Sequence, residues 1–145
     1  MSEVSILHAD CMEYMAVQVD NAFDLAIVDP PYGIDVGNTL TGPQRGSGNG
    51  LAQKTEFKPK DWDKSAPPPE YFDELRRVSK NQIIWGANHF CGIFGGSSSC
   101  WIVWDKLTGE SDFADCELAY TSFKTAVRKF SFRWSGMLQG DMANK

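Results

Sequence analysis

The sequence predicts an α/β fold in which a parallel β-sheet is flanked by helices. Short apolar segments alternate along the chain with segments of helical periodicity, which is the pattern of such a sheet. Polar residues follow directly after several apolar segments, at 29–32, 86–88 and 105–106. In open α/β sheets, ligands bind in the crevice outside the carboxyl ends of the strands. The length of 145 residues indicates a single domain spanning 1–145.

The first third of the chain is expected to form strand, helix and strand. Residues 4–7 are mostly apolar and predict a short strand. A helix follows, because apolar side chains recur from Met12 to Val19 at three- and four-residue steps. Segment 23–28 is apolar apart from Asp24 and predicts a buried strand. This strand must end at Asp29-Pro30-Pro31-Tyr32-Gly33, because two prolines cannot continue a central strand.

Residues 37–69 differ in composition from the rest of the chain. Glycines are frequent in the first part, and three consecutive prolines, Pro67 to Pro69, end it. The segment is predicted to be a flexible loop within the domain. Such long loops in compact domains serve as lids or binding loops, or are disordered linkers, and both readings stay open.

The remainder alternates again between helix and strand. A helix is predicted over 70–80, with Tyr71, Phe72, Leu75 and Val78 on its inner face. Strands are predicted at 81–85, 100–104, 116–123 and 129–134, with a short helix at 88–94 and a loop at 95–99. The last strand alternates strictly between polar and apolar residues, so one of its faces is expected to contact water.

Composition excludes several classes of protein. A net charge of −5 argues against a protein that coats nucleic acid electrostatically, although a local basic patch is still possible. No apolar run is long enough to cross a membrane and no signal peptide is present, so a cytoplasmic protein is expected. The spacing of the four cysteines does not suit zinc, and no metal site is predicted. The cysteines are expected to be small buried hydrophobic residues.

The segment Asp29-Pro30-Pro31-Tyr32 carries the strongest functional signal. An exocyclic amine on a base is a poor nucleophile, because its lone pair is delocalised into the ring. Two acceptors aimed at its two hydrogens favour the tetrahedral form, in which the lone pair is free. Asp29 offers a charged acceptor and the Pro30 carbonyl a second one, while Tyr32 offers an aromatic plane for stacking. A strand-ending proline turn with a packed tyrosine is the structural alternative.

This segment resembles the catalytic motif Asp/Asn/Ser-Pro-Pro-Tyr/Phe/Trp of the DNA amino-methyltransferases, which use S-adenosylmethionine. The resemblance implies a Rossmann-like sheet, double-stranded DNA as partner, and a flipped adenine as the methyl acceptor. It also implies that Asp29, Pro30, Pro31 and Tyr32 are the catalytic residues.

The resemblance covers nearly the whole chain. Segment 6–15 is similar to the family's Gly-Asp-x-x-Glu-x-Leu segment, with Ala9 in place of glycine, which implies that Asp10 lies near the adenine ring of the methyl donor. Asp10, Cys11 and Asp29 are therefore the expected cofactor-binding residues. Segments 83–90, 101–106 and 113–123 are similar to the next strands with their pocket-edge residues. Together they resemble small phage or prophage adenine methyltransferases.

One part of the family pattern is missing from the sequence. No strand followed by a donor-binding glycine turn, such as Asp-Pro-Phe-x-Gly-x-Gly, is present. In a permuted class of the family the catalytic motif comes first and the donor-binding motif later. We therefore expect the chain to be the front half of a longer, truncated enzyme. The missing strands would leave an unpaired edge, which favours a homodimer or a missing C-terminal half as partner.

Basic residues are the candidates for contact with DNA. Near the C-terminus they are interleaved with aromatic side chains, which suits phosphate and base contacts, although a solvated strand face gives the same pattern. The candidate substrate or DNA contacts are Asn88, Lys106, Lys124, Arg128, Lys129 and Arg133. Glu117 is either a pocket acceptor or a strand-face charge. Trp85, Trp104, His8 and His89 are more often structural than functional in such positions.

Other functions also fit the motif. Aspartate at its first position favours adenine, whereas serine is more frequent in the enzymes that methylate cytosine at N4. Asparagine there would suggest RNA or protein glutamine as acceptor. A different class of protein, a catalytically silent remnant or DNA-binding module, would keep the fold without a donor site. Binding of the methyl donor distinguishes the enzyme from this alternative.

Overall fold

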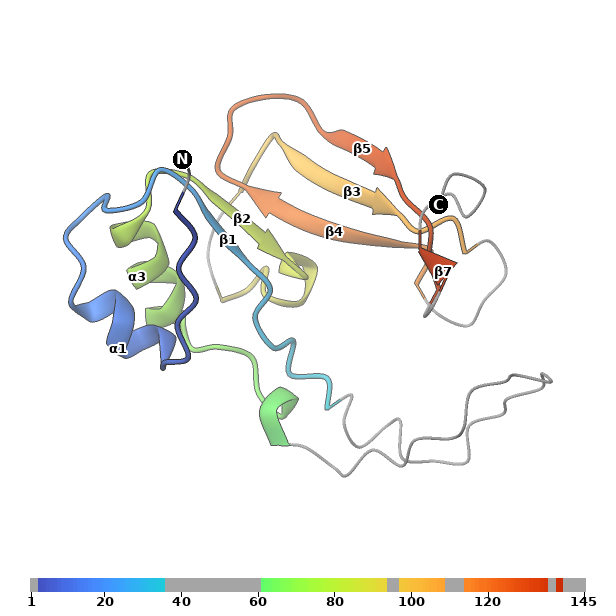
Figure 1. Cartoon of the computed structure of the whole chain (residues 1–145). Coiled ribbons are helices and arrows are strands. Elements are labelled where there is room, and N and C mark those ends of the chain that lie inside the picture. Colours follow the sequence, from blue (N-terminus) through green and yellow to red (C-terminus); the bar gives the residue numbers. More distant parts are fainter. Residues whose placement is uncertain (1–2, 36–60, 94–96, 109–113, 136–137, 140–145) are drawn as a thin grey trace.

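The computed structural model describes residues 3–35, 61–93, 97–108, 114–135 and 138–139. Its centre is a mixed five-stranded sheet of order β1-β2-β4-β3-β5 (Figure 1). The strands are β1 (Ala26–Val28), β2 (Gln82–Trp85), β3 (Trp101–Asp105), β4 (Cys116–Thr121) and β5 (Arg128–Ser131). The expected α/β fold is confirmed to the extent of this mixed sheet and its accompanying helices.

The direction of β4 differs from the prediction. β1 and β2 are parallel, as are β3 and β5, but β4 is antiparallel to both of its neighbours, β2 and β3. A parallel connection needs a crossover of a dozen or more residues. The segment 106–115 that joins β3 to β4 is too short for one, so β4 returns beside β3 and the prediction of a parallel sheet was wrong in this part.

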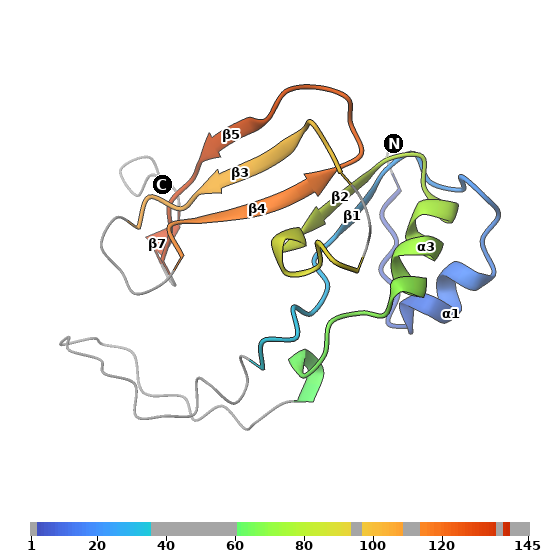
Figure 2. The same ribbon diagram turned by 180° about the vertical axis from the view of Figure 1, so that it is seen from behind.

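Two helices form next to β1 and β2 (Figures 1 and 2). Helix α1 (Cys11–Ala16) begins where the carboxylate of Asp10 accepts hydrogen bonds from the amides of Met12 and Glu13. Helix α3 (Pro69–Val78) begins with proline, which lacks the amide hydrogen that a first turn cannot use. Its inner face is buried as predicted, and the buried residues are Tyr71, Phe72, Leu75 and Val78.

The core lies between these helices and one face of the sheet. Ile84 on β2 and the segment after β2, with Ala87 and Phe90, complete the cluster that α3 covers. Val28 and Tyr120 pack against the same cluster from β1 and β4. We call this side of the sheet the helix-covered face.

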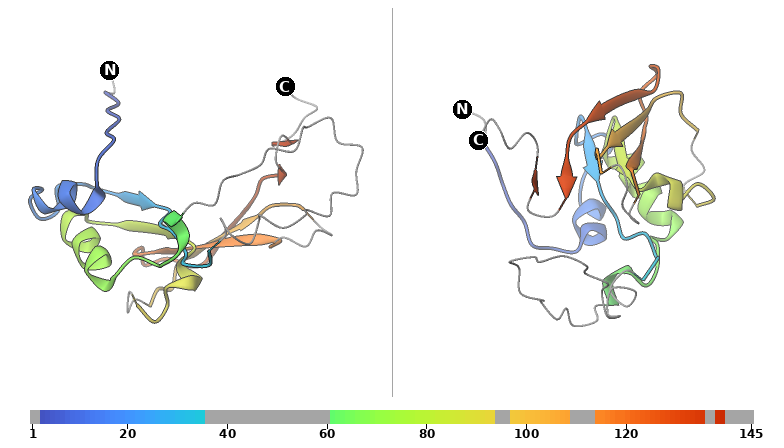
Figure 3. Two further views of the ribbon diagram at one scale, coloured as in Figure 1. Left: turned by 90° about the horizontal axis from the view of Figure 1, so that it is seen from below. Right: turned by 90° about the vertical axis from the view of Figure 1, so that its right-hand side faces the viewer.

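The opposite face of the sheet is open in the described part of the chain (Figure 3). Ile27 on β1 points away from the core and its relative exposure is 62%. Ile83, Ile102 and Phe123 line a hollow of about 520 Å³ on this face. Among the described residues, the helices therefore cover one face of the sheet.

The N-terminal segment does not form the predicted strand. Residues 3–9 carry no regular structure, and Val4, Ile6 and Leu7 are 84%, 92% and 65% exposed. A strand needs a neighbour to bind its backbone groups. Residues 4–7 have no such neighbour among the described residues, and the left view of Figure 3 shows the segment leading away from the sheet.

Other elements are shorter than predicted. Helix α1 ends at Ala16, and strand β1 is reduced to three residues because Phe23 makes only an isolated bridge with Ser79. The predicted helix at 88–94 is a single 3-10 turn, η2 (Ala87–His89). β5 is exposed on both sides, so its predicted dry face is absent. Two short strands, β6 (Trp134–Ser135) and β7 (Leu138–Gln139), form a separate hairpin.

The predicted loop 37–69 is only partly described. Its residues 37–60 lie outside the described residues. Residues 61–69 contain 3-10 helix η1 (Asp61–Asp63), in which Asp63 is 2% exposed, and the first residue of α3, Pro69.

The cysteines correct another expectation. Only Cys100 is buried, whereas Cys11, Cys91 and Cys116 are exposed. Cys11 starts α1 and Cys116 starts β4, so both stand at ends of elements, where packing is incomplete. Among the helices in the described part of the chain, none is both long and apolar enough to cross a membrane.

Candidate active site at the carboxyl edge of the sheet

The ends of the strands bring the predicted polar segments together at one edge of the sheet. β1, β2, β3 and β5 run in the same direction, so Asp29, Gly86 and Lys106, which follow three of them, share this edge. Because β4 is antiparallel, its first residues, including Glu117, come to the same edge. This is the edge at which α/β sheets bind ligands.

Asp29 and Tyr32 form a hydrogen bond within the Asp-Pro-Pro-Tyr segment. The Tyr32 hydroxyl donates to Oδ1 of Asp29 at 2.7 Å. Asp29 itself is exposed, whereas Pro30 behind it is buried. The Tyr32 ring stacks on His89 with ring centroids 4.8 Å apart and lies edge-on to Phe90 at 6.0 Å. The turn therefore presents its carboxylate to solvent and turns its aromatic ring toward η2.

Asp63 fixes the backbone of this turn from a distant part of the chain. Its Oδ1 accepts hydrogen bonds from the amides of Tyr32 at 2.7 Å and Gly33 at 2.9 Å. Gly33 has a positive φ of 72°, and a Cβ there would lie 2.6 Å from the amide nitrogen of Ala66. A buried carboxylate that accepts two amide hydrogens holds the turn in one conformation.

Gly86 makes room for the Tyr32 ring. A Cβ built on Gly86 would lie 2.1 Å from Cε1 of Tyr32, and Gly86 has a φ of +65°. Only glycine combines this left-handed backbone with so close an approach. The sharp turn after β2 therefore sets the position of the aromatic residue in the turn after β1.

The surroundings of Tyr32 keep its phenol protonated. Burial raises the pKa of Tyr32 well above its ordinary value of 10.0. The hydrogen bond to Asp29 raises this pKa further, as do the negative charges of Asp29, Glu117 and Asp63. Three carboxylates thus act on one hydroxyl, which remains a hydrogen-bond donor through the neutral range.

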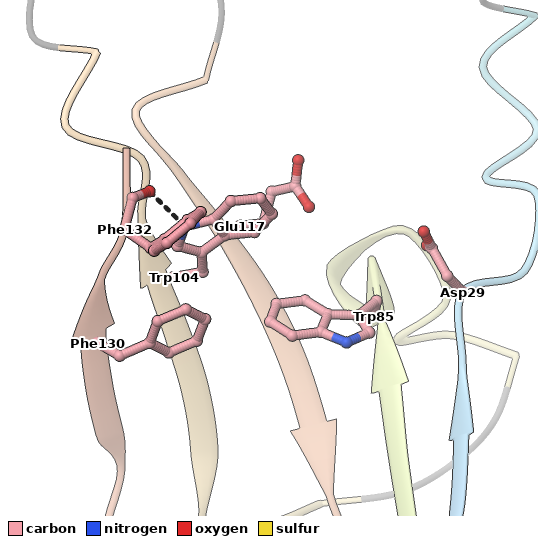
Figure 4. Close-up of a pocket in the computed structure, with 6 residues that line it drawn as sticks. All are labelled: Asp29, Trp85, Trp104, Glu117, Phe130 and Phe132. Carbon is pink, nitrogen blue, oxygen red and sulfur yellow. Dashed lines mark hydrogen bonds between the residues drawn. The ribbon is translucent and has the colours of Figure 1, made fainter. Parts of the chain in front are cut away.

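A pocket of about 360 Å³ crosses the sheet on the open face (Figure 4). We call it the cross-sheet pocket. Each strand of the sheet contributes to it, either from within the strand or from the residue just beyond its end. The lining residues are Asp29, Trp85, Glu117, Trp104, Phe130 and Phe132. Its volume falls in the range of about 300–1,000 Å³ that is usual for small-molecule sites.

Aromatic contacts build the floor of this pocket. Trp104 stacks on Phe130 with ring centroids 6.1 Å apart and meets Trp85 edge-on at 6.2 Å. The Trp104 indole nitrogen donates to the carbonyl of Phe132 at 2.9 Å, which fixes the ring (Figure 4). Lys106 forms an ion pair with Glu117, and its Nζ lies 5.6 Å from the Trp104 ring centroid.

A second pocket, of about 550 Å³, lies on the other side of Asp29. We call it the helix-side pocket. It is formed by the start of α1, the proline turn, the segment before α3 and Tyr71. Its lining includes Cys11, Met12, Val28, Asp29, Pro30 and Pro31. Val28 belongs to the helix-covered face, whereas Trp85 in the cross-sheet pocket belongs to the open face. Asp29 is therefore shared by two pockets that open toward different faces of the sheet.

No family model matches the chain, and no match is found among the curated proteins.

The structure gathers only some of the predicted site residues. Cys11, Asp29, Pro30 and Pro31 line one pocket together, but the Asp10 carboxylate is used to cap α1. Lys106 joins the site through Glu117. Asn88 is exposed on η2, next to His89, whose ring stacks on Tyr32.

The basic residues near the C-terminus are divided between the two edges of the sheet. Lys124 follows the carboxyl end of β4, which is the opposite edge of the sheet from Asp29. Arg128 opens β5 near that edge, and Lys129 is paired with Asp105 at 2.7 Å. Arg133 follows β5 toward the carboxyl edge. A common phosphate-binding surface for these residues stays a prediction.

Several residues at the site were missed or assigned another role. Asp63 lies within the predicted loop, and nothing in its local pattern indicates a contact with Tyr32. Trp85 and Trp104 were expected in the core but line the cross-sheet pocket. Their position just before the strand ends is the signal that could have indicated this. Among the described residues, no group of His, Cys, Asp and Glu suits a metal ion.

Proposed function

We propose that this chain is the catalytic part of an S-adenosylmethionine-dependent DNA amino-methyltransferase that acts on the exocyclic amine of a flipped adenine. One observation carries the proposal. The exposed carboxylate of Asp29 stands at the carboxyl end of β1 and borders two pockets, as a group between a methyl donor and an acceptor amine must. The resemblance of the Asp-Pro-Pro-Tyr segment to the family motif supports the same reading.

Asp29 acts in this proposal as a hydrogen-bond acceptor for the amine. The carboxylate attracts an N–H of the acceptor and favours the geometry in which the nitrogen lone pair is free. Tyr32 donates to Oδ1 of Asp29 and limits its rotation, and Asp63 holds the turn that carries both residues. Catalysis then rests on position and electrostatics rather than on a strong base.

The helix-side pocket fits the methyl donor in chemical character. Its walls are mostly apolar, and Asp29 supplies a negative charge suited to a sulfonium cation. Cys11, Met12 and Pro31 would contact the adenosine part. The donor supplies an electrophilic methyl group when it is bound.

The mixed sheet supports a Rossmann-like methyltransferase fold as part of this proposal. Neighbouring parallel strands β1 and β2 place the proline turn and the Gly86 turn side by side. Double-stranded DNA is the proposed partner, and its adenine would enter the cross-sheet pocket after leaving the duplex. The proposal further implies an enzyme that is encoded by a bacterium or a phage and works in the cytoplasm.

Calorimetric titration with S-adenosylmethionine tests the proposal. We expect one-to-one binding that Cys11→Phe weakens at least about tenfold, because the larger side chain fills the helix-side pocket. Cys91→Phe, a change at another exposed cysteine, should leave binding unchanged. Absence of binding by the folded chain would contradict a donor site built from these residues alone, and would leave the front half of a truncated enzyme and the silent remnant or DNA-binding module as the two readings.

A further inference from the structure

Two carboxylates, Asp29 and Glu117, line the cross-sheet pocket, and only one belongs to the recognised motif. The sheet places them with one strand between them. Val28 pairs with Ile84, so Asp29 stands beside Trp85 at the end of β2. β4 follows β2 in the sheet and carries Glu117 on the open face, two residues from Ala119, the partner of Trp85. A ring lying on Trp85 would therefore meet both carboxylates near one of its edges (Figure 4).

Lys106 forms an ion pair with Glu117 beside the pocket floor. The ammonium group pairs with the Glu117 carboxylate and also lies over the Trp104 ring. The side chains of Lys106 and Glu117 are only 17% and 34% exposed, and Glu117 lines the pocket. An ionised carboxylate accepts hydrogen bonds and donates none.

The pocket floor suits a flat aromatic ligand. Trp85 lies between Asp29 and the Trp104–Phe130 stack in Figure 4. Aromatic planes of this kind bind bases by stacking, with little dependence on base identity. Selection between rings must then come from the polar groups at the rim.

We propose that Glu117 determines which acceptor the pocket takes, selecting a heteroaromatic ring that carries an amino group and rejecting one with a carbonyl in its place. This inference rests on the proposed function and deepens it. An amine directs its hydrogens toward the carboxylates, whereas a carbonyl oxygen would face them with lone pairs. Lys106 is a positioning residue, because it acts on the bound acceptor only through Glu117.

Adenine and hypoxanthine are the pair for the test, since they differ only at this edge of the ring, with NH₂ and an unprotonated N1 in adenine against C=O and N1–H in hypoxanthine. Two single-stranded DNA oligonucleotides, identical except for one adenine or one hypoxanthine in a thymine tract, are titrated into the full chain. Quenching of tryptophan fluorescence reports stacking on Trp85 and Trp104. We expect the wild-type chain to bind the adenine strand at least about tenfold more tightly.

Glu117→Gln isolates the role of the carboxylate, because an amide can also donate to a carbonyl. The preference for adenine should fall about tenfold in Glu117→Gln and in part in Lys106→Met. Glu117→Asp should retain part of the preference, and Glu3→Gln, at an exposed site away from the pocket, should retain all of it. Thermal unfolding of each variant shows that it is folded.

An unchanged preference in folded Glu117→Gln would overturn the role of Glu117 while leaving the proposed methyltransferase intact. Equal binding of both strands by the wild-type chain would overturn it as well. Failure of the proposed function has a separate signature, which is the absence of methyl-donor binding in the calorimetric titration. The two failures are therefore distinguishable.

Discussion

Gly86 and Tyr32 approach so closely that a Cβ on Gly86 would lie 2.1 Å from Cε1 of the Tyr32 ring. The two residues follow neighbouring parallel strands, β1 and β2. The turn after β2 therefore fixes the aromatic residue of the turn after β1, and with it the hydroxyl that donates to Asp29. The proposed catalytic carboxylate depends on a contact between two segments far apart in the sequence.

Gly86→Ala should displace the Tyr32 ring and strain the backbone, which has a φ of +65° at this residue. We expect a loss of about 2–4 kcal/mol in the free energy of unfolding, measured by denaturant titration. Gly92→Ala is the matched control, because a Cβ there meets no atom within 4 Å. Equal stability of the two variants would contradict the close packing of Tyr32.

Asp63→Ala should destabilise the proline turn, because the amides of Tyr32 and Gly33 lose their buried acceptor. A loss of about 2–4 kcal/mol in unfolding free energy is expected. Asp63→Asn keeps an acceptor oxygen and should cost less. Asp73→Ala breaks an exposed ion pair with Arg76 and should change stability by less than about 1 kcal/mol. An unchanged free energy of unfolding in Asp63→Ala would show that the turn keeps its conformation without Asp63.

The elements predicted most accurately are those whose own sequence determines them. The inner face of α3 follows from helical periodicity, and β2, β3 and β4 from short apolar runs. The proline turn after Val28 was placed correctly because two prolines leave few alternatives. The positions of Asp29, Gly86 and Lys106 at one edge follow from strand order and direction.

What could not be predicted depends on partners distant in the chain. The apolar pattern of residues 4–7 suits a strand, but no neighbour pairs with them in the described residues, and Ile6 is 92% exposed. The reversal of β4 depends on the length of one connection rather than on its own residues. The contact of Asp63 with Tyr32 joins positions that no local periodicity relates.

Tyr32 should make stability depend on alkaline pH. Its folded pKa is raised above the ordinary value of 10.0, so its contribution is fully present below about pH 10 and is lost as pH rises through the folded pKa. Tyr32→Phe lacks this ionisation. The difference in unfolding free energy between wild type and Tyr32→Phe should therefore shrink above pH 10. A difference that is constant with pH would contradict the protonated phenol beside Asp29.

The cysteines should differ in reactivity toward a thiol reagent. Cys11, Cys91 and Cys116 are exposed and should be labelled in the folded chain, whereas buried Cys100 should be labelled only after unfolding. Peptide mass spectrometry after brief labelling identifies the modified positions. Rapid labelling of Cys100 in the folded chain would contradict its 4% exposure and the hydrogen bond that its sulfur accepts from Thr125.

Methylation of DNA by the chain and by its Asp29→Ala variant tests the central claim most directly. Double-stranded DNA is incubated with S-adenosylmethionine and either protein, and methylated bases are counted by mass spectrometry after digestion. Asp29 is exposed at the pocket, so its replacement should leave the folded state intact in thermal unfolding. The account predicts N6-methyladenine with the wild-type chain and at least about a hundredfold less with Asp29→Ala. No methylated adenine with the wild-type chain, or equal amounts with both proteins, would contradict it.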